Sequence, residues 1–187
     1  MAIYTKISKG EVKSIERKFN LGKIISFKGI KKGIENTNYL LRTKNKKFIL
    51  TIFEKRVQKK DLPFFMNLMD KLNNHKINCP KPQKNKKENF IINIKKKPAS
   101  IVSFVEGKDK FNLKIKDCYE IGKNIAKLHR ASKKIKLYRK NSISLSYRSK
   151  MLKKIGNGYK SIDVNLNDLM KKTLLETKRK WPRNLPA

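Results

Sequence analysis

Three short apolar runs within residues 21–56 constrain the fold more than any other part of the sequence. They cover residues 21–27, 38–43 and 48–53, and their apolar residues recur as in half-buried β-strands. Only the polar stretch Lys44-Asn45-Lys46-Lys47 separates the last two runs, which suits a hairpin turn. The sequence therefore predicts three consecutive strands in one antiparallel sheet.

The link between the first two runs is longer and carries Gly29 and Gly33, followed by Glu-Asn-Thr-Asn at positions 35–38. Glycine frees the backbone, so that N–H groups can point toward an anion, and short polar side chains can add hydrogen bonds. A loop that covers nucleotide phosphates needs these features. An ordinary hairpin tip fits the same residues, so both interpretations stay open on this loop alone.

The elements around this stretch complete a small α+β domain. Residues 9–20 have helical spacing, and a helix is expected from Asp61, as N-cap, to about Asn74, with Pro63 in its first turn. Its apolar stripe is expected to be Leu62, Phe65, Met69 and Leu72. Residues 90–94 and 99–105 read as two further strands. Three strands, a helix and two strands form the five-stranded antiparallel sheet and helix of a protein-kinase-like small lobe.

Beyond Gly107 the sequence becomes helical. Cys118, Ile121, Ile125 and Leu128 form one apolar stripe, and residues 167–180 are a candidate last helix with Leu166, Met170 and Leu174 inward. Residues 137–165 show no clear pattern, and residues 181–187 are expected to be extended. We expect a nucleotide-binding domain over residues 1–106 and the incomplete start of a helical lobe over 107–187.

The net charge of +35 would ordinarily indicate a nucleic-acid partner. However, only eight of the 49 basic residues are Arg, the side chain best suited to bidentate recognition of phosphates and bases. Lys is spread along the whole chain together with Ile and Asn, as in a general compositional bias. A Lys-rich nucleic-acid-binding protein therefore remains an alternative interpretation, and no dedicated nucleic-acid partner is expected.

Other classes of protein find little support in the sequence. No stretch approaches the roughly 20 apolar residues that span a bilayer, and residues 1–6 lack the apolar core of a signal peptide. Two Cys and two His, without metal-type spacing, predict reduced thiols and no metal site built from them. We expect a cytoplasmic protein without a membrane partner.

Several motifs taken together closely resemble the homoserine kinases of the aminoglycoside phosphotransferase and choline kinase superfamily. The resemblance covers most of the chain and weakens between about 146 and 180. The motifs that carry it are Gly33-Ile34-Glu35-Asn36-Thr37-Asn38-Tyr39, residues 48–56 (FILTIFEKR), residues 61–65 (DLPFF), Cys79-Pro80-Lys81-Pro82, Ile121-Gly122 and Leu128-His129.

The resemblance implies transfer of the γ-phosphoryl group of ATP, with Mg²⁺, to the side-chain hydroxyl of L-homoserine in threonine biosynthesis. A kinase for another small metabolite, with a choline- or aminoglycoside-type acceptor, is the nearest alternative. Residues 101–107 match the strand and hinge between kinase lobes, where backbone groups would hold adenine. The nucleotide-binding residues that the resemblance implies are Gly33, Glu35, Asn36, Thr37, Asn38, Ile49, Thr51, Ser103 and Val105.

Thr51 departs from the wider superfamily, in which a Lys at this strand position grips the phosphates. A Thr hydroxyl offers hydrogen bonding without charge, so neutralisation would come from Mg²⁺, loop N–H groups, or Lys55 and Arg56. Without that Lys, Asp70 is interpreted as a surface residue, although its helix in relatives carries the partner of the Lys. His129 is interpreted as structural.

A kinase of this superfamily also needs a catalytic-loop Asp, a following Asn and a later Asp for Mg²⁺. Asp163 and Asp168 follow His129, but neither lies in a His-x-Asp motif with an Asn five residues later. In relatives a segment like residues 181–187 comes just before that loop. We therefore expect no catalytic residues in this chain, which would end a few residues before the catalytic loop and be inactive by itself.

Overall fold

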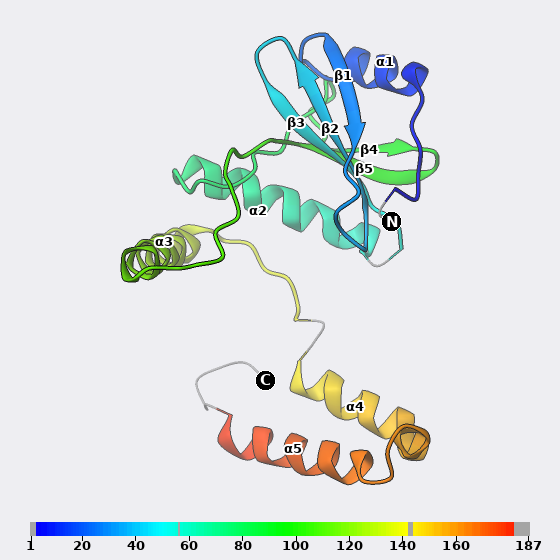
Figure 1. The fold of residues 1–187 in the computed structure, drawn as a ribbon, viewed down its shortest axis with the longest axis vertical. Coiled ribbons are helices and arrows are strands. Elements are labelled where there is room, and N and C mark those ends of the chain that lie inside the picture. Colours follow the sequence, from blue (N-terminus) through cyan, green and yellow to red (C-terminus); the bar gives the residue numbers. More distant parts are fainter. Residues whose placement is uncertain (1–2, 56, 142–143, 182–187) are drawn as a thin grey trace. The chain divides into compact units, whose positions relative to one another are not determined.

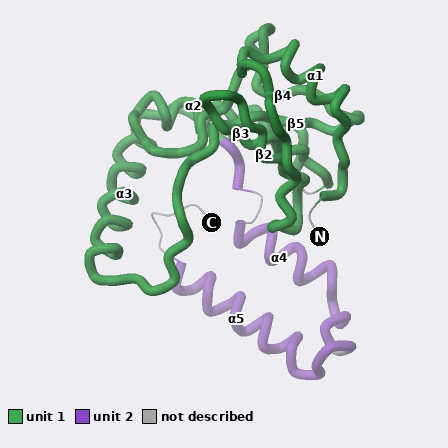
Figure 2. Tube along the Cα trace, turned by 45° about the horizontal axis from the view of Figure 1, so that its top comes forward, with its two compact units in different colours: residues 1–138 green, residues 139–187 purple. Residues whose placement is uncertain are grey.

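The computed structural model describes residues 3–55, 57–141 and 144–181, which divide into two compact units, 1–138 and 139–187 (Figure 2). The first unit holds a five-stranded sheet and three α-helices (Figure 1). Its elements are α1 (Lys9–Lys18), β1 (Ile24–Gly29), β2 (Thr37–Thr43), β3 (Lys47–Ile52), the 3₁₀ turn η1 (Lys59–Asp61), α2 (Leu62–Asn74), β4 (Ile91–Ile94), β5 (Lys97–Ser103) and α3 (Ile115–Lys134).

The sheet is antiparallel throughout, with strand order β1-β2-β3-β5-β4. This confirms the predicted five-stranded sheet, with strand boundaries that differ from the predicted ones by at most three residues. The first strand begins at Ile24 because Gly22, with φ +82°, makes a turn before it. Lys95 and Lys96, with φ of +47° and +64°, form the tight turn between β4 and β5, a turn conformation that joins adjacent antiparallel strands.

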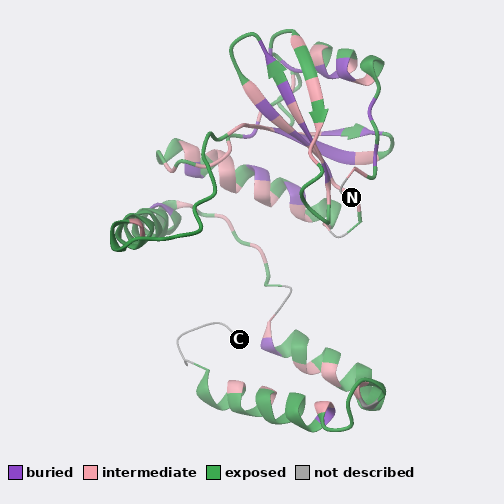
Figure 3. Cartoon of the chain, in the orientation of Figure 1, coloured by how far each residue is buried: buried purple, intermediate pink, exposed green. Residues whose placement is uncertain are grey.

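One face of the sheet packs against α1 and forms the main core (Figure 3). Strand alternation brings Tyr39, Leu41, Leu50 and Ile101 to this face, where each is at most 5% exposed. Helix α1 adds Val12 and Ile15, and its first turn is fixed by reciprocal capping between Ser8 and Glu11. The α1 side of the sheet therefore carries the main hydrophobic core.

Helix α2 lies across the sheet from α1 in Figures 1 and 2. Pro63 occupies its first turn as predicted, whereas Asp61 stands at the N-cap position without a capping hydrogen bond from its side chain. The buried side chains are Leu62, Met66 and Leu72. Phe65 and Met69, which we predicted on the buried stripe, are only half-buried, because the inward face of α2 is rotated toward Met66.

Helix α3 confirms the helical character predicted after Gly107, and its apolar stripe is largely exposed. Ile121, Ile125 and Leu128 are 48%, 47% and 37% exposed, and Cys118 is exposed as well. Ala131 is the buried residue of this helix, which contacts α2 near its C-terminal end. Helix α3 is thus amphipathic, and among the described residues few pack against its apolar face.

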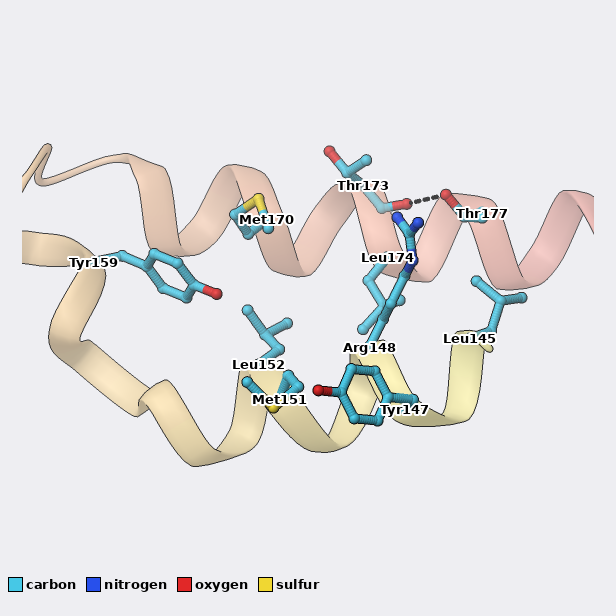
Figure 4. Close-up of a pocket in the computed structure, with 10 residues that line it drawn as sticks. All are labelled: Leu145, Tyr147, Arg148, Met151, Leu152, Tyr159, Met170, Thr173, Leu174 and Thr177. Carbon is cyan, nitrogen blue, oxygen red and sulfur yellow. Dashed lines mark hydrogen bonds between the residues drawn. The ribbon is translucent and has the colours of Figure 1, made fainter. Parts of the chain in front are cut away.

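The second unit is a helical hairpin of α4 (Leu145–Ile155), the 3₁₀ segment η2 (Gly156–Ser161) and α5 (Leu166–Lys180). Helix α4 lies within the stretch for which the sequence showed no clear pattern. Met170 and Leu174 line a groove of about 370 Å³ between α4 and α5, opposite Met151 and Leu152 (Figure 4). The extended conformation predicted for residues 181–187 falls, after Trp181, outside the described residues.

The compact units divide at residue 138, whereas the sequence predicted domains at 1–106 and 107–187. Because α3 packs on α2, it belongs to the first compact unit. The predicted boundary refers to kinase lobes and stays a prediction. Among the described residues, no helix combines the length and apolar character needed to cross a bilayer.

A polar network ties the N-terminal segment to the sheet. Glu54, just after β3, has a side chain that is only 9% exposed. Its Oε1 accepts hydrogen bonds from the hydroxyls of Thr5 and Thr37, both at 2.7 Å, and its Oε2 is paired with Lys97. Burial by itself would raise the pKa of the Glu54 carboxyl, but the hydrogen bonds from Lys97, Thr37 and Thr5 together hold it below 4.5.

This network makes the stability of the first unit depend on pH. The pKa of Glu54 is lower in the folded state than its ordinary value of 4.5, so its contribution is complete above that pH and is lost as the pH falls through the folded pKa. At neutral pH we expect Glu54→Gln to lower the free energy of unfolding by about 1.5–3 kcal/mol, because hydrogen bonds to a charged group are weakened. Urea unfolding, followed by the circular dichroism of the sheet, measures the difference at each pH.

The matched control is Glu88→Gln, which removes a carboxylate paired with Lys84 on the surface and 78% exposed. Exposed pairs contribute little, so we expect less than about 0.5 kcal/mol at any pH. The difference between wild type and Glu54→Gln should shrink in acid. A difference that stays constant from neutral pH into acid would contradict an ionised, buried Glu54.

Candidate functional site

The loop between β1 and β2 has the backbone conformation that its glycines suggested. It is closed at its base by the Ile30 N–H group, which donates to the Asn38 carbonyl at 2.8 Å. Gly33 has φ +121°, a conformation that side-chain-bearing residues rarely adopt. Residues 31–35 are exposed. Gly29 is used differently, because the side chain of Ile3 occupies the space that a Cβ would need.

The end of this loop lies directly beside Thr51, one of the predicted nucleotide-binding residues. Asn38 of β2 is the register partner of Thr51 on β3. Because Tyr39, Leu50 and Ile52 point into the core on the α1 side, Asn38 and Thr51 face the opposite side of the sheet. The Thr51 hydroxyl donates to Asn38 Oδ1 at 2.8 Å. A hydrogen bond thus joins Asn38, at the end of the loop, to Thr51 on the neighbouring strand.

That hydrogen bond determines which groups remain for a ligand. A Thr hydroxyl can donate only one hydrogen bond. Because Thr51 donates it to Asn38, Thr51 has no proton left to donate to a phosphate. With Oδ1 occupied, the Asn38 amide turns its two N–H donors to other partners. Donors are what a phosphate oxygen requires. The geometry therefore leaves the Asn38 amide, rather than the Thr51 hydroxyl, as the candidate donor on this side of the sheet, with Thr51 fixing its orientation.

Thr37 lies on the other face of β2 and cannot serve a ligand with its side chain. It is fully buried, and its hydroxyl donates to Glu54 while accepting from the N–H groups of Tyr4 and Thr5 at 2.9 and 3.0 Å. Asn36, half-buried, accepts from the Glu54 N–H at 3.4 Å through its side-chain oxygen. Of the predicted ligand residues, Thr37 therefore keeps only its backbone as a candidate.

The predicted hinge begins at the end of β5 and borders a hollow of about 650 Å³. The Ser103 and Phe104 N–H groups donate to the carbonyls of Lys81 and Lys47, at 2.8 and 3.0 Å. Within the described residues this leaves the Val105 N–H as the candidate donor for a base. The hollow is lined by Ser103 and Val105 but by no residue of the loop at 30–36, so adenine and phosphate sites would be separate.

Most of the other residues singled out in the sequence are exposed. Lys55 is exposed, Asp70 is half-buried and His129 is exposed, while Arg56 falls outside the described residues. Asp163 accepts from the Asn165 N–H at 2.7 Å, and the Asp168 side chain is 86% exposed. In the part of the chain that the structure describes, no three His, Cys, Asp or Glu side chains gather as metal ligands.

Sequence reasoning missed Glu54 and Lys97. Their partners are Thr5 and Thr37, so the network joins residues that are 17 to 92 positions apart. No local spacing reveals such a cluster. One signal was nevertheless available: alternation along β2 puts Thr37 on the same face as Tyr39 and Leu41, where a polar side chain needs a buried partner.

The chain is similar over its whole length to curated homoserine kinases. It is 35% identical over 186 residues to that of Parvibaculum lavamentivorans, and 36% identical over 187 residues to that of Nitrobacter hamburgensis. A third relative, from Agrobacterium fabrum, is 34% identical. In each comparison all of this chain is covered, but it spans only 57–58% of the relative's length.

Among solved structures, the fold is similar to that of spectinomycin phosphotransferase APH(9)-Ia in complex with ADP and spectinomycin. The TM-score is 0.67 at 12% sequence identity, covering 95% of this chain and 60% of that one. The likeness confirms the predicted small lobe of a kinase-like fold followed by the start of a helical lobe. A family model described as the phosphotransferase enzyme family APH matches residues 26–187. The chain belongs to this phosphotransferase family.

Proposed function

We propose that this chain is the nucleotide-binding part of an ATP-dependent homoserine kinase. The observation that carries the proposal is the Asn38–Thr51 pair, which places two amide donors beside a glycine-bearing loop. Family membership supports phosphoryl transfer, and the solved relative APH(9)-Ia holds ADP. In the proposed complex, Gly33 and Asn36 to Asn38 lie over the phosphates, while the backbone near Val105 holds adenine.

The residues present fit the nucleotide better than its metal ion. Mg²⁺ takes oxygen ligands and is usually bound by carboxylates together with phosphate oxygens. The described residues supply donors at the loop but no carboxylate cluster. We therefore expect Mg²⁺ to arrive with ATP, coordinated mainly by phosphate oxygens and water. The role of this part of the chain is to bind and orient the nucleotide.

The acceptor is proposed from the relatives. The curated proteins that match the whole chain at about 35% identity are homoserine kinases, so L-homoserine is the first candidate and threonine biosynthesis the setting. A kinase for another small hydroxylated or aminated metabolite is the second. Both acceptors are compatible with the nucleotide-binding role that we propose for this part of the chain.

A polyanion-binding function finds less support. A basic hollow of about 400 Å³ lies between the end of α2 and α3 and is lined mainly by Lys and Arg side chains. Only one of them, Arg130, is an arginine, and no Phe, Tyr or Trp lines the hollow. Single-stranded nucleic acids are usually held by stacking on such rings. Of the nine Phe, only Phe111 is exposed and the other eight are buried or half-buried, so they offer little surface for stacking.

Asn38→Asp tests the proposed donor. The substitution keeps the shape of the side chain but replaces the amide donors with a negative charge opposite the phosphates. We expect ADP affinity to fall about tenfold or more, because a hydrogen bond to a charged group contributes about 1.5–3 kcal/mol and repulsion adds to its loss. Isothermal titration calorimetry on residues 1–187 measures the affinity.

Thr51→Val is the companion variant, since it removes only the hydroxyl that orients Asn38. We expect a smaller loss, about three- to tenfold, corresponding to one neutral hydrogen bond. Asn93→Asp, on β4 and exposed, serves as the control for adding a negative charge to the same sheet. Equal ADP affinities for wild type and Asn38→Asp would contradict the proposed phosphate site.

The catalytic part of the proposal is tested by turnover. No His-x-Asp motif followed by Asn occurs in residues 1–187, so with ATP, Mg²⁺ and L-homoserine this chain is expected to form no phosphohomoserine above background. Joined to the part of the Parvibaculum lavamentivorans enzyme beyond the match, it should support the reaction. A chimera that binds ADP yet leaves L-homoserine unphosphorylated, or product formation by the unjoined chain, would count against the proposal.

A further inference from the structure

The N-terminal segment, residues 3–7, contacts the loop that we propose to cover the phosphates. Tyr4 Oη donates to the Ile34 carbonyl, within the loop, at 3.0 Å. The Tyr4 and Thr5 N–H groups donate to Thr37 Oγ1 at the end of the loop. Ile3 packs on Gly29, where the loop begins. A segment distant in sequence thus touches the start, the middle and the end of the loop.

The segment is itself held firmly on the sheet. Tyr39 Oη donates to the Thr5 carbonyl at 3.1 Å and accepts from the Ile7 N–H at 3.2 Å. Lys95 donates to the Lys6 carbonyl at 2.8 Å. These contacts come from β2 and from the turn between β4 and β5. Hydrogen bonds to the sheet therefore hold the N-terminal segment in place where it contacts the loop.

Glu54 joins the N-terminal segment to the loop. Its carboxylate accepts hydrogen bonds from the Thr5 and Thr37 hydroxyls. Lys97 in turn donates to Thr5 Oγ1 at 2.8 Å. The Thr37 hydroxyl thereby uses its proton and accepts two N–H groups, so its bonding capacity is filled. In addition, the Glu54 N–H donates to the Asn36 side chain. Fully satisfied polar networks hold a single arrangement.

We infer that Glu54, acting through Thr37 and the N-terminal segment, is a positioning residue for the phosphate loop. It lies on the face of the sheet away from the Asn38–Thr51 pair and does not touch the nucleotide. Thr37 and Asn38 are consecutive residues of β2 with opposite orientations. Fixing the Thr37 side chain on the α1 side therefore fixes where the Asn38 amide points on the other. The expected effect on ADP affinity rests on the proposed function, whereas the ordering of the loop by Glu54 and Thr37 does not.

The experiment measures loop order and ADP affinity separately. Amide hydrogen exchange of residues 31–38 reports the loop, calorimetry reports ADP binding, and urea unfolding reports stability, all on residues 1–187. In Thr37→Val and Glu54→Gln, we expect loop exchange to be faster and ADP affinity lower by about tenfold, as for loss of a buried hydrogen bond that orients a ligand group. Thr37→Ser, which keeps the hydroxyl, should bind within about twofold of wild type.

Tyr4→Phe and Ile15→Val separate positioning from stability. Tyr4 is 56% exposed, so Tyr4→Phe should leave stability unchanged while it loosens the loop by losing the bond to Ile34. Ile15 is buried under the sheet, away from the loop, so Ile15→Val should lower stability but leave loop exchange and ADP affinity unchanged. This pair also decides the case if Glu54→Gln does not fold.

Wild-type exchange rates at residues 31–38 in Thr37→Val and Tyr4→Phe would overturn the inference. ADP affinities that follow stability alone, with Ile15→Val as weak as Thr37→Val, would overturn it too. Failure of wild type to bind ADP would instead overturn the proposed function. In that case the exchange rates by themselves still show whether Glu54 and Thr37 order the loop.

Discussion

The alternation of β2 at Thr37 and Asn38 is the constraint on which the site depends. One residue is fully buried against Glu54, and the next faces the opposite side of the sheet beside Thr51. Because successive side chains of a strand point to opposite faces, neither orientation can change without moving the other. The buried ionic network and the proposed nucleotide surface are thereby coupled across a single peptide unit.

The same arrangement accounts for the missing lysine on β3. Most kinases place a cation where Thr51 stands, whereas here the position holds a neutral hydroxyl that orients an amide. In the proposed site, binding would rely on directed donors, and Mg²⁺ and neighbouring cations would neutralise the phosphate charge. The +35 net charge does not replace the lysine by itself, since a diffuse field attracts anions without orienting them.

Much of the fold could be predicted, because strand alternation and turn residues are local signals. The five strands, α2 with Pro63, and the glycine conformation at Gly33 follow from them. Strand alternation also predicts that Thr37 faces the core with Tyr39 and Leu41, whereas the family motif led us to expect Thr37 at the nucleotide. The Glu54 network could not be predicted, since it joins residues that only the folded sheet brings together. The α3 stripe was recognised, but its burial depends on partners that spacing does not reveal.

The most direct test of the account is a crystal structure of residues 1–187 with ADP. The account predicts phosphate oxygens within hydrogen-bonding distance, about 2.7–3.2 Å, of Asn38 Nδ2 and of loop N–H groups. It also predicts that Thr51 still donates to Asn38 and that Thr37 still donates to Glu54. Phosphates bound instead among surface lysines, with the Gly33 to Asn38 loop empty, would contradict it.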